Sequence, residues 1–109
     1  RVGAARALEL CMRGNIIDAP EALRIGLCNR VLPAAELLPA AIAAIEEIAA
    51  MGPLAVAAVK SLIHRGADLP LPDANLGEVE AFAGLFASAD QREGMAAFLG
   101  KRRPSFTGC

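Results

Sequence analysis

The sequence has few of the side chains that most often carry out catalysis or bind metal. It contains one histidine, no tyrosine and no tryptophan among 109 residues. Its three cysteines, Cys11, Cys28 and Cys109, are far apart and form no CxxC spacing. A zinc site needs clustered Cys or His ligands, so we expect no metal. Scattered cysteines in an odd number favour reduced thiols in a cytoplasmic protein, with Cys11 and Cys28 packed in a core.

The sequence also lacks an excess of charge of one sign and a long hydrophobic run. The net charge is −1 at pH 7 and the pI is about 5.8, whereas a nucleic-acid-binding surface needs a basic excess. No apolar run approaches the roughly 18 residues of a membrane span, and no secretory pattern opens the chain. The sequence therefore predicts neither a nucleic-acid partner nor a membrane partner.

What the sequence does contain is a large share of apolar side chains. Hydrophobic residues make up 55 % of the chain without counting glycine, above the usual range of about 45–50 % that includes it. One helical domain of this size has too little interior to bury them, so we expect a partner surface and self-association. The chain opens with RVGAARALEL, without methionine and already in helical rhythm, and we expect it to be a piece of a longer protein.

Alanine-rich segments separated by glycine and proline predict an all-α chain of about six helices in one domain, residues 1–109. The expected helices are residues 2–12, 19–25, 39–51, 53–66, 72–87 and 90–103. The main third helix is expected to start at Pro39, because proline disfavours helical geometry at the residue before it, and residues 34–37 are expected to form at most a single turn. Residues 27–32 are expected to be short and extended.

Capping residues and apolar stripes add detail to this prediction. Asp18 with Glu21, and Asp90 with Glu93, have the three-residue spacing of capping boxes at helix starts. The isoleucines of the third helix lie on one stripe that we expect to be buried: Ile42, Ile45 and Ile48. Glycines inside the fifth helix are expected where helices approach closely: Gly77 and Gly84.

No stretch has the pattern of a complete active site. The motifs G-x-S-x-G and GxGxxG and the phosphate-binding loop are missing. His64 stands at the end of the fourth helix without a partner carboxylate nearby, so we interpret it as a solvated imidazole. The acidic pairs Glu46–Glu47 and Glu78–Glu80 fall on polar helix faces, where residues one or two apart do not face each other. We therefore assign no catalytic residue.

The stretch DQREGMAAFLGKRRPSF gathers three basic residues near two aromatic rings. By their spacing, Met95, Phe98 and either Lys101 or Arg102 share one helical face. An aromatic ring one turn from a cation is able to hold a purine while the cation meets a phosphate. The same residues also fit a packed Phe98 with cations that complement the helix C-terminus. The residues alone leave both interpretations open.

Three stretches resemble the enoyl-CoA hydratase/isomerase (crotonase) family. LELCMRGNIIDAPEALRIGLCNRVLP is similar to the segment after the family's catalytic core, and EEIAAMGPLAVAAVKSLIHRGADLPL to the helix pair that follows. EAFAGLFASADQREGMAAFLGKRRPSF resembles the family's C-terminal signature. The resemblance covers essentially all 109 residues.

The resemblance implies the C-terminal helical module of a ClpP/crotonase-type fold whose β/α spiral core is absent. In the family this module drives assembly into trimers or hexamers and covers the acyl-CoA site, while the catalytic groups lie in the core. The Phe and Lys of the family's AFLxKR motif, here Phe98 and Lys101, reach the CoA of a neighbouring subunit. Gly100 stands where the family often has Glu, which would loosen the helix end that aims Lys101.

Two functions from different classes follow. In the first, the chain belongs to a lyase or isomerase of fatty acid metabolism that hydrates or isomerises an enoyl-CoA, with acyl-CoA as substrate and no cofactor. The piece alone is then inactive. In the second, it is a free-standing helical oligomerisation or interaction module without catalysis. A reading frame that continues upstream into a spiral core would favour the first, and a start codon just before Arg1 the second.

Overall fold

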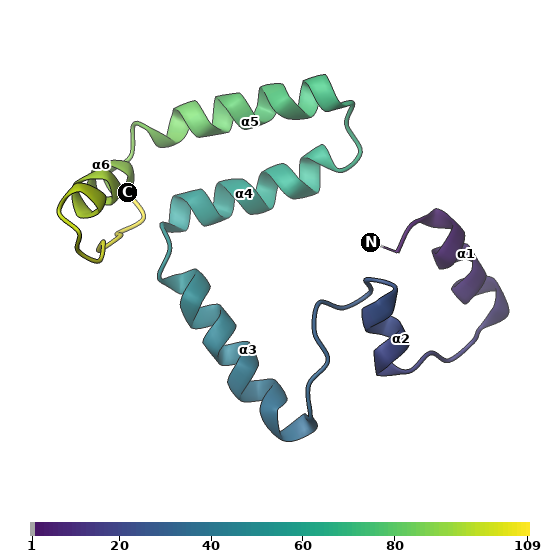
Figure 1. The fold of residues 1–109 in the computed structure, drawn as a ribbon. Helices are drawn as coiled ribbons and strands as arrows, with labels where there is room; N and C mark the ends of the chain where they lie inside the picture. Colours follow the sequence, from purple (N-terminus) through teal and green to yellow (C-terminus); the bar gives the residue numbers. More distant parts are fainter. Residues whose placement is uncertain (1) are drawn as a thin grey trace. The chain divides into compact units, whose positions relative to one another are not determined.

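The computed structural model describes residues 2–109, and these residues are helical or irregular, without a strand. Six helices follow one another along this part of the chain (Figure 1): α1 Ala4–Arg13, α2 Ala19–Arg24, α3 Ala34–Ala49, α4 Pro53–Gly66, α5 Leu71–Leu85 and α6 Ala89–Leu99. Residues 27–32 contain no helix. The predicted all-α class is confirmed for the described residues.

The chain divides into two compact units, residues 1–41 and residues 42–109, and the division falls inside α3. In the first unit, α1 ends at Gly14, which has φ 63° and donates its N–H to the Leu10 carbonyl at 3.0 Å. Glycine adopts positive φ without a steric penalty, which is why the helix stops there as predicted.

Helix α2 begins with half of the expected capping box. The Asp18 carboxylate accepts a hydrogen bond from the Glu21 N–H at 2.9 Å. The second bond of the expected box, from the Asp18 N–H to the Glu21 carboxylate, does not form within residues 2–109. The Glu21 carboxylate instead accepts from the Arg24 guanidinium on the next turn. A charge-assisted bond with two parallel N–H groups is stronger than one bond to a backbone N–H, so Arg24 is the preferred partner.

Helix α3 begins earlier than predicted. It starts at Ala34, so Pro39 lies inside the helix and not at its first residue. Proline removes one N–H donor, but the loss here falls in the second turn and concerns a single bond. The Ala-Ala-Glu-Leu-Leu run before Pro39 consists of good helix formers. The Glu36 N–H donates to the Pro33 carbonyl at 2.9 Å, which closes the first turn.

Helices α4 and α5 run antiparallel and pack against each other in the second unit (Figure 1). A Cβ built on Gly66 would lie 3.6 Å from Ala74 Cβ, and one on Gly77 would lie 3.8 Å from Leu62 Cδ2. The expected close approach at Gly77 is confirmed. The same expectation at Gly84 is wrong, since a Cβ there would meet nothing within 4 Å.

Few side chains are buried. Among the described residues only Ile25, Asp90 and Ala97 are buried, at 7 %, 6 % and 1 % exposure. The expected burial of the α3 stripe is wrong, because no helix of the second unit covers these side chains: Ile42, Ile45 and Ile48. The apolar faces of this unit are therefore available to a further surface.

The cysteines do not pack as predicted. Cys11 lies on α1, which has no buried residue, and is exposed. Cys28 is half-buried in the irregular segment after α2. The expectation of a core position is wrong for Cys11. The three thiols are free.

Two further features of residues 2–109 concern membranes and metal ions. No single helix there is long and apolar enough to cross a membrane, although α3 and α4 taken together as a bent pair reach that length and apolarity. No group of three or more His, Cys, Asp or Glu side chains there is arranged to hold a metal ion. His64 is exposed in the last turn of α4, where the sequence placed it.

Candidate functional site

Helix α6 carries the residues that the sequence singled out, but its start differs from the prediction. Ser88 is the N-cap: its hydroxyl oxygen accepts from the Gln91 N–H at 3.0 Å and donates to the Leu85 carbonyl at 2.7 Å. The expected capping box of Asp90 and Glu93 is therefore wrong. Serine caps a helix about as well as aspartate does, so Ser88 is able to replace Asp90 as the cap. The carboxylates of Asp90 and Glu93 are bonded to residues farther along the chain.

Asp90 binds the C-terminal tail, which we define as residues 104–109. One carboxylate oxygen accepts from the Thr107 N–H at 2.7 Å and from the Thr107 hydroxyl at 3.3 Å. The other accepts from the Gly108 N–H at 2.9 Å. Asp90 is buried, and its charge lies in the first turn of α6, where the helix dipole favours an anion. These contacts hold the tail against the beginning of α6.

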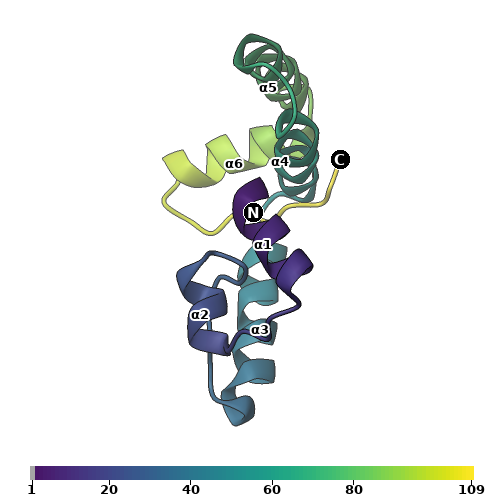
Figure 2. The same cartoon turned by 90° about the vertical axis from the view of Figure 1, so that its right-hand side faces the viewer.

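The tail also packs on two helices of the second unit. Phe106 is half-buried, and a Cβ built on Gly94 of α6 or on Gly52 before α4 would lie 3.5 Å or 3.8 Å from its ring. At the end of the tail, the Ala89 N–H donates to the Cys109 carbonyl at 2.6 Å. Figure 2 shows the tail leaving the far end of α6 and running back along it to the C-terminus near α4.

Glu93 holds the turn between α6 and the tail. Its two oxygens accept from Arg102 Nη1 at 2.6 Å and Arg102 Nη2 at 2.8 Å, and one of them also accepts from the Ser105 N–H at 2.8 Å. The bonds from Arg102 and then from Ser105 lower the pKa of Glu93 from 4.5 to about 2. We call Glu93, Arg102 and Ser105 the turn clamp.

Lys101 occupies the position that ends α6, with φ 49°. Its N–H donates to the Phe98 carbonyl at 3.2 Å, and the Arg102 N–H donates to the Ala97 carbonyl at 3.0 Å. These two bonds form a Schellman motif, in which glycine is the usual residue at positive φ. Gly100 stands one position earlier and has φ −79°. The motif therefore places a lysine where a glycine is common.

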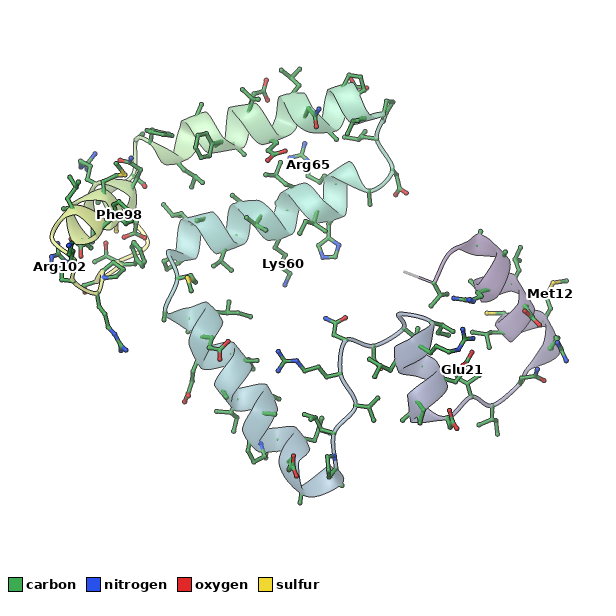
Figure 3. All side chains as sticks on the ribbon, viewed as in Figure 1. Met12, Glu21, Lys60, Arg65, Phe98 and Arg102 are labelled. Carbon is green, nitrogen blue, oxygen red and sulfur yellow. The ribbon has the colours of Figure 1, made fainter. Side chains whose placement is uncertain are left out.

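The predicted pair of Phe98 and Lys101 lies at one end of α6. Phe98 is in the last turn and 80 % exposed, so the alternative of a packed ring is wrong in this chain (Figure 3). Lys101 lies one residue beyond the C-cap, so the prediction that it shares a helical face with Phe98 is wrong. The exposed Lys101 takes part in none of the ion pairs within residues 2–109. Both side chains are thus open to solvent, Phe98 on the last turn of α6 and Lys101 three residues later in the turn that follows.

Arg102 has a different role from the one considered in the sequence. From the sequence, Arg102 is either the cation that meets a ligand phosphate, in place of Lys101, or a cation that complements the negative end of the helix dipole. Its guanidinium instead forms both bonds to Glu93, and it is labelled at the α6 turn in Figure 3. Lys101 is therefore the better candidate for an anionic ligand.

An apolar pocket of about 370 Å³ opens between α4, α5 and α6 in the second unit. The Phe82 and Phe86 rings meet edge to face there, with centroids 5.2 Å apart. The pocket is lined mainly by large apolar side chains: Leu54, Phe82, Leu85, Phe86, Met95 and Phe106. Such a lining suits an apolar group and offers no acid or base for chemistry, because the Asp90 carboxylate at its edge is bonded to the tail.

Sequence reasoning missed the contacts that hold the turn. The spacing of Asp90 and Glu93 predicts capping residues and gives no link from either carboxylate to Thr107 or Arg102. The available signal was a pair of carboxylates inside the last helix, followed by Pro104 and a tail with free backbone N–H groups. That signal does not distinguish a helix cap from a tail contact.

A family model for enoyl-CoA hydratase/isomerase matches residues 1–109. The chain belongs to this family. The resemblance seen in the sequence is thus confirmed at the level of the family, and the helical fold agrees with it.

Members of the enoyl-CoA hydratase/isomerase family match nearly the whole chain. A probable enoyl-CoA hydratase of Mycobacterium tuberculosis is 42 % identical over 106 residues, which cover 97 % of this chain and 41 % of the relative. A crotonyl-CoA hydratase of Syntrophomonas wolfei is 40 % identical over 105 residues, which cover 96 % and 40 %. The crystal structure of an enoyl-CoA hydratase from Bacillus anthracis matches with a TM-score of 0.95 and 37 % identity, covering 99 % of this chain and 42 % of that one. The chain therefore spans about two fifths of the length of these relatives.

Proposed function

We propose that this chain is the C-terminal helical part of an enzyme of the enoyl-CoA hydratase/isomerase type, where it serves assembly and supplies part of the CoA site. The match over 97 % of the chain to a probable enoyl-CoA hydratase carries the proposal. The exposed apolar faces support the assembly role, and the exposed turn at the end of α6 supports the CoA role.

The assembly role is supported by large apolar side chains of the second unit that are more than half exposed. Val59 and Ile63 of α4 and Val79 of α5 are 54 %, 67 % and 63 % exposed. Complete burial of one such side chain is worth about 1.5–3 kcal/mol. The proposed partner is a second copy of the same protein, in a trimer or hexamer as the family resemblance implies.

The CoA role is assigned to Phe98 and Lys101. The Phe98 ring would lie against the adenine, and the Lys101 ammonium near the ribose phosphate, in the CoA bound to a neighbouring subunit. Stacking one base on an aromatic ring contributes about 1–3 kcal/mol, and an exposed charge pair about 0–1 kcal/mol. Because a 1 mM complex corresponds to about 4.1 kcal/mol, the chain alone should bind CoA with millimolar affinity or more weakly.

The chemistry is assigned to groups outside this chain. Hydration or isomerisation of an enoyl-CoA needs hydrogen-bond donors arranged for the oxyanion that develops at the thioester carbonyl. It also needs carboxylates that add water or move a proton. We assign no such role to residues 1–109, and we expect no hydratase activity from the chain alone. The acyl-CoA thioester is the proposed substrate, and the scheme uses no further cofactor.

Steady-state kinetics of the complete enzyme, the protein whose reading frame includes residues 1–109, test this proposal. Lys101→Ala should raise KM for crotonyl-CoA and leave kcat nearly unchanged, because the contact is the same in the ground and transition states. A collapse of kcat at constant KM would show that the role of Lys101 is misassigned. A reading frame without an upstream core would instead favour the interaction module, and hydration by the chain alone would contradict the division of roles.

A further inference from the structure

The turn clamp lies directly beside the residue that carries the proposed ligand cation. Glu93 receives two hydrogen bonds from Arg102, at 2.6 Å and 2.8 Å, and one from the Ser105 N–H at 2.8 Å. Arg102 follows Lys101 in the chain, so its side chain anchors one flank of Lys101. The other flank is the last turn of α6. Lys101 is therefore held from both sides.

Lys101 has a backbone conformation that lysine rarely adopts without support. At φ 49° its Cβ crowds the neighbouring carbonyl oxygen, which disfavours this region for lysine, whereas glycine, and to a lesser extent Asn and Asp, adopt it more readily. A residue stays in such a region only where the surrounding structure holds it there. The supports nearest to Lys101 are the two Schellman bonds and the turn clamp. Gly100, at φ −79°, does not relieve the strain.

The clamp differs from an ordinary surface ion pair, which contributes little because water competes for both charges. Arg102 presents a planar fork to both oxygens of one carboxylate, and this geometry fixes direction as well as distance. A backbone N–H, that of Ser105, shares the same carboxylate. The side chain of Glu93 is only 24 % exposed, against 50 % for Arg102. The arrangement therefore constrains the chain on both sides of the turn.

We infer that Glu93 is a positioning residue for the CoA contact: through Arg102 and Ser105 it holds the turn that aims the Lys101 ammonium. Its effect on CoA binding rests on the proposed function, whereas its effect on the Lys101 backbone does not. Glu93 touches no substrate and acts only through Lys101. Without the clamp, Lys101 keeps its charge but samples other directions, so CoA binding weakens while the chemical step is unaffected.

The first experiment measures the Lys101 backbone in the 109-residue chain by NMR. The wild type should show the strong intraresidue HN–Hα NOE of a residue at positive φ. Glu93→Gln and Arg102→Gln should lose that signal, and Arg102→Lys should weaken it, because lysine keeps the charge but not the fork. Arg103→Gln is the matched control, since it removes a charge from the same turn but no clamp contact.

Two results of this experiment would overturn the inference. One is an unchanged NOE in both Glu93→Gln and Arg102→Gln. The other is its absence in the wild type. Far-UV circular dichroism of each variant shows whether the helices are intact, so that a lost NOE is attributed to the turn and not to unfolding.

The second experiment uses the complete enzyme with crotonyl-CoA. Lys101→Ala and Glu93→Gln should each raise KM by about twofold to fivefold, the range of one exposed charge contact, with kcat unchanged. Because Glu93 acts through Lys101, the double variant should be no worse than Lys101→Ala. If the KM of the double variant instead rises by the product of the two single increases, Glu93 acts independently of Lys101 and the inference is overturned. If Lys101→Ala alone leaves KM unchanged, the proposed CoA role fails, and the NMR result then decides the positioning role.

Discussion

Lys101, and not the preceding Gly100, has the left-handed conformation that ends α6. Lys101 has φ 49°, whereas Gly100 has φ −79°. A residue with a Cβ is disfavoured in the left-handed region by about 1–2 kcal/mol, and glycine is not. The turn therefore gives up stability at the position where it presents a cation. This exchange of stability for a charged side chain is typical of functional positions.

Two substitutions of Lys101 separate the effect of its backbone conformation on stability from the effect of its charge on CoA binding. Lys101→Gly should raise the free energy of unfolding by about 1 kcal/mol, because it removes the Cβ at positive φ. Lys101→Ala keeps the Cβ and should leave stability nearly unchanged. Both variants lack the ammonium and should raise KM for crotonyl-CoA equally in the complete enzyme. Urea unfolding followed by circular dichroism makes the comparison, and equal stability of the two variants would contradict the strain argument.

The tail should loosen when Asp90 is removed. In Asp90→Ala the N–H groups of Thr107 and Gly108 lose their acceptor, and a bond to a charged group contributes about 1.5–3 kcal/mol. Amide hydrogen exchange at these two residues should accelerate accordingly. Asp73→Ala is the matched control, because Asp73 also lies in the first turn of a helix but makes no contact with the tail. Equal exchange rates in the wild type and Asp90→Ala would rule out the contact.

The turn clamp should persist in mild acid. Glu93 has a pKa of about 2 in the folded chain, below the ordinary value of 4.5, mainly because Arg102 donates to its charged form. The stabilisation is therefore fully present above about pH 4.5 and is lost as the pH falls toward 2. The carboxyl carbon shift of Glu93, followed by NMR, should titrate with a midpoint near pH 2. In Arg102→Gln the midpoint should move upward, and a wild-type midpoint near 4.5 would show that the clamp does not form.

The chain should self-associate. Ile45 on α3 is 64 % exposed, and burial of its side chain at a contact is worth about 1.5–3 kcal/mol, roughly a tenfold to hundredfold change in association. Ile45→Glu should therefore shift the chain toward the monomer. Ala43→Glu places the same charge on a different face of α3 and should have a smaller effect. Sedimentation equilibrium measures this, and an 11.3 kDa species in the wild type at micromolar concentration would refute the prediction.

The helices that the sequence predicted best are those bounded by local signals. The bounds of α4 were predictable because Pro53 and Gly66 both act on the backbone of their immediate neighbours. The same reasoning failed for α3, where the local rule about Pro39 was outweighed by the helix formers on its N-terminal side. The preference of a single residue is therefore reliable only where the residues around it favour the same structure.

The contacts of the tail depend on residues far apart in the sequence, and no local rule predicts them. Asp90 and Glu93 have the spacing of a capping box, but Ser88 is an equally good cap, and the partners that bind Asp90 follow 17 and 18 residues later. Periodicity identified the apolar stripe of α3 correctly as a stripe. It does not reveal which surface covers the stripe, which is why the predicted burial failed.

The bond between the Ala89 N–H and the Cys109 carbonyl joins the two ends of residues 89–109. This segment is therefore a closed loop, fastened at its base and again midway by the turn clamp. Proteins open locally in contiguous cooperative units, and we expect this segment to be one of them, because releasing one contact removes the geometry that the others need. The helix, the Lys101 turn and the Phe106 anchor should then behave as a single foldon, so that the proposed CoA-contacting surface is either wholly formed or wholly lost.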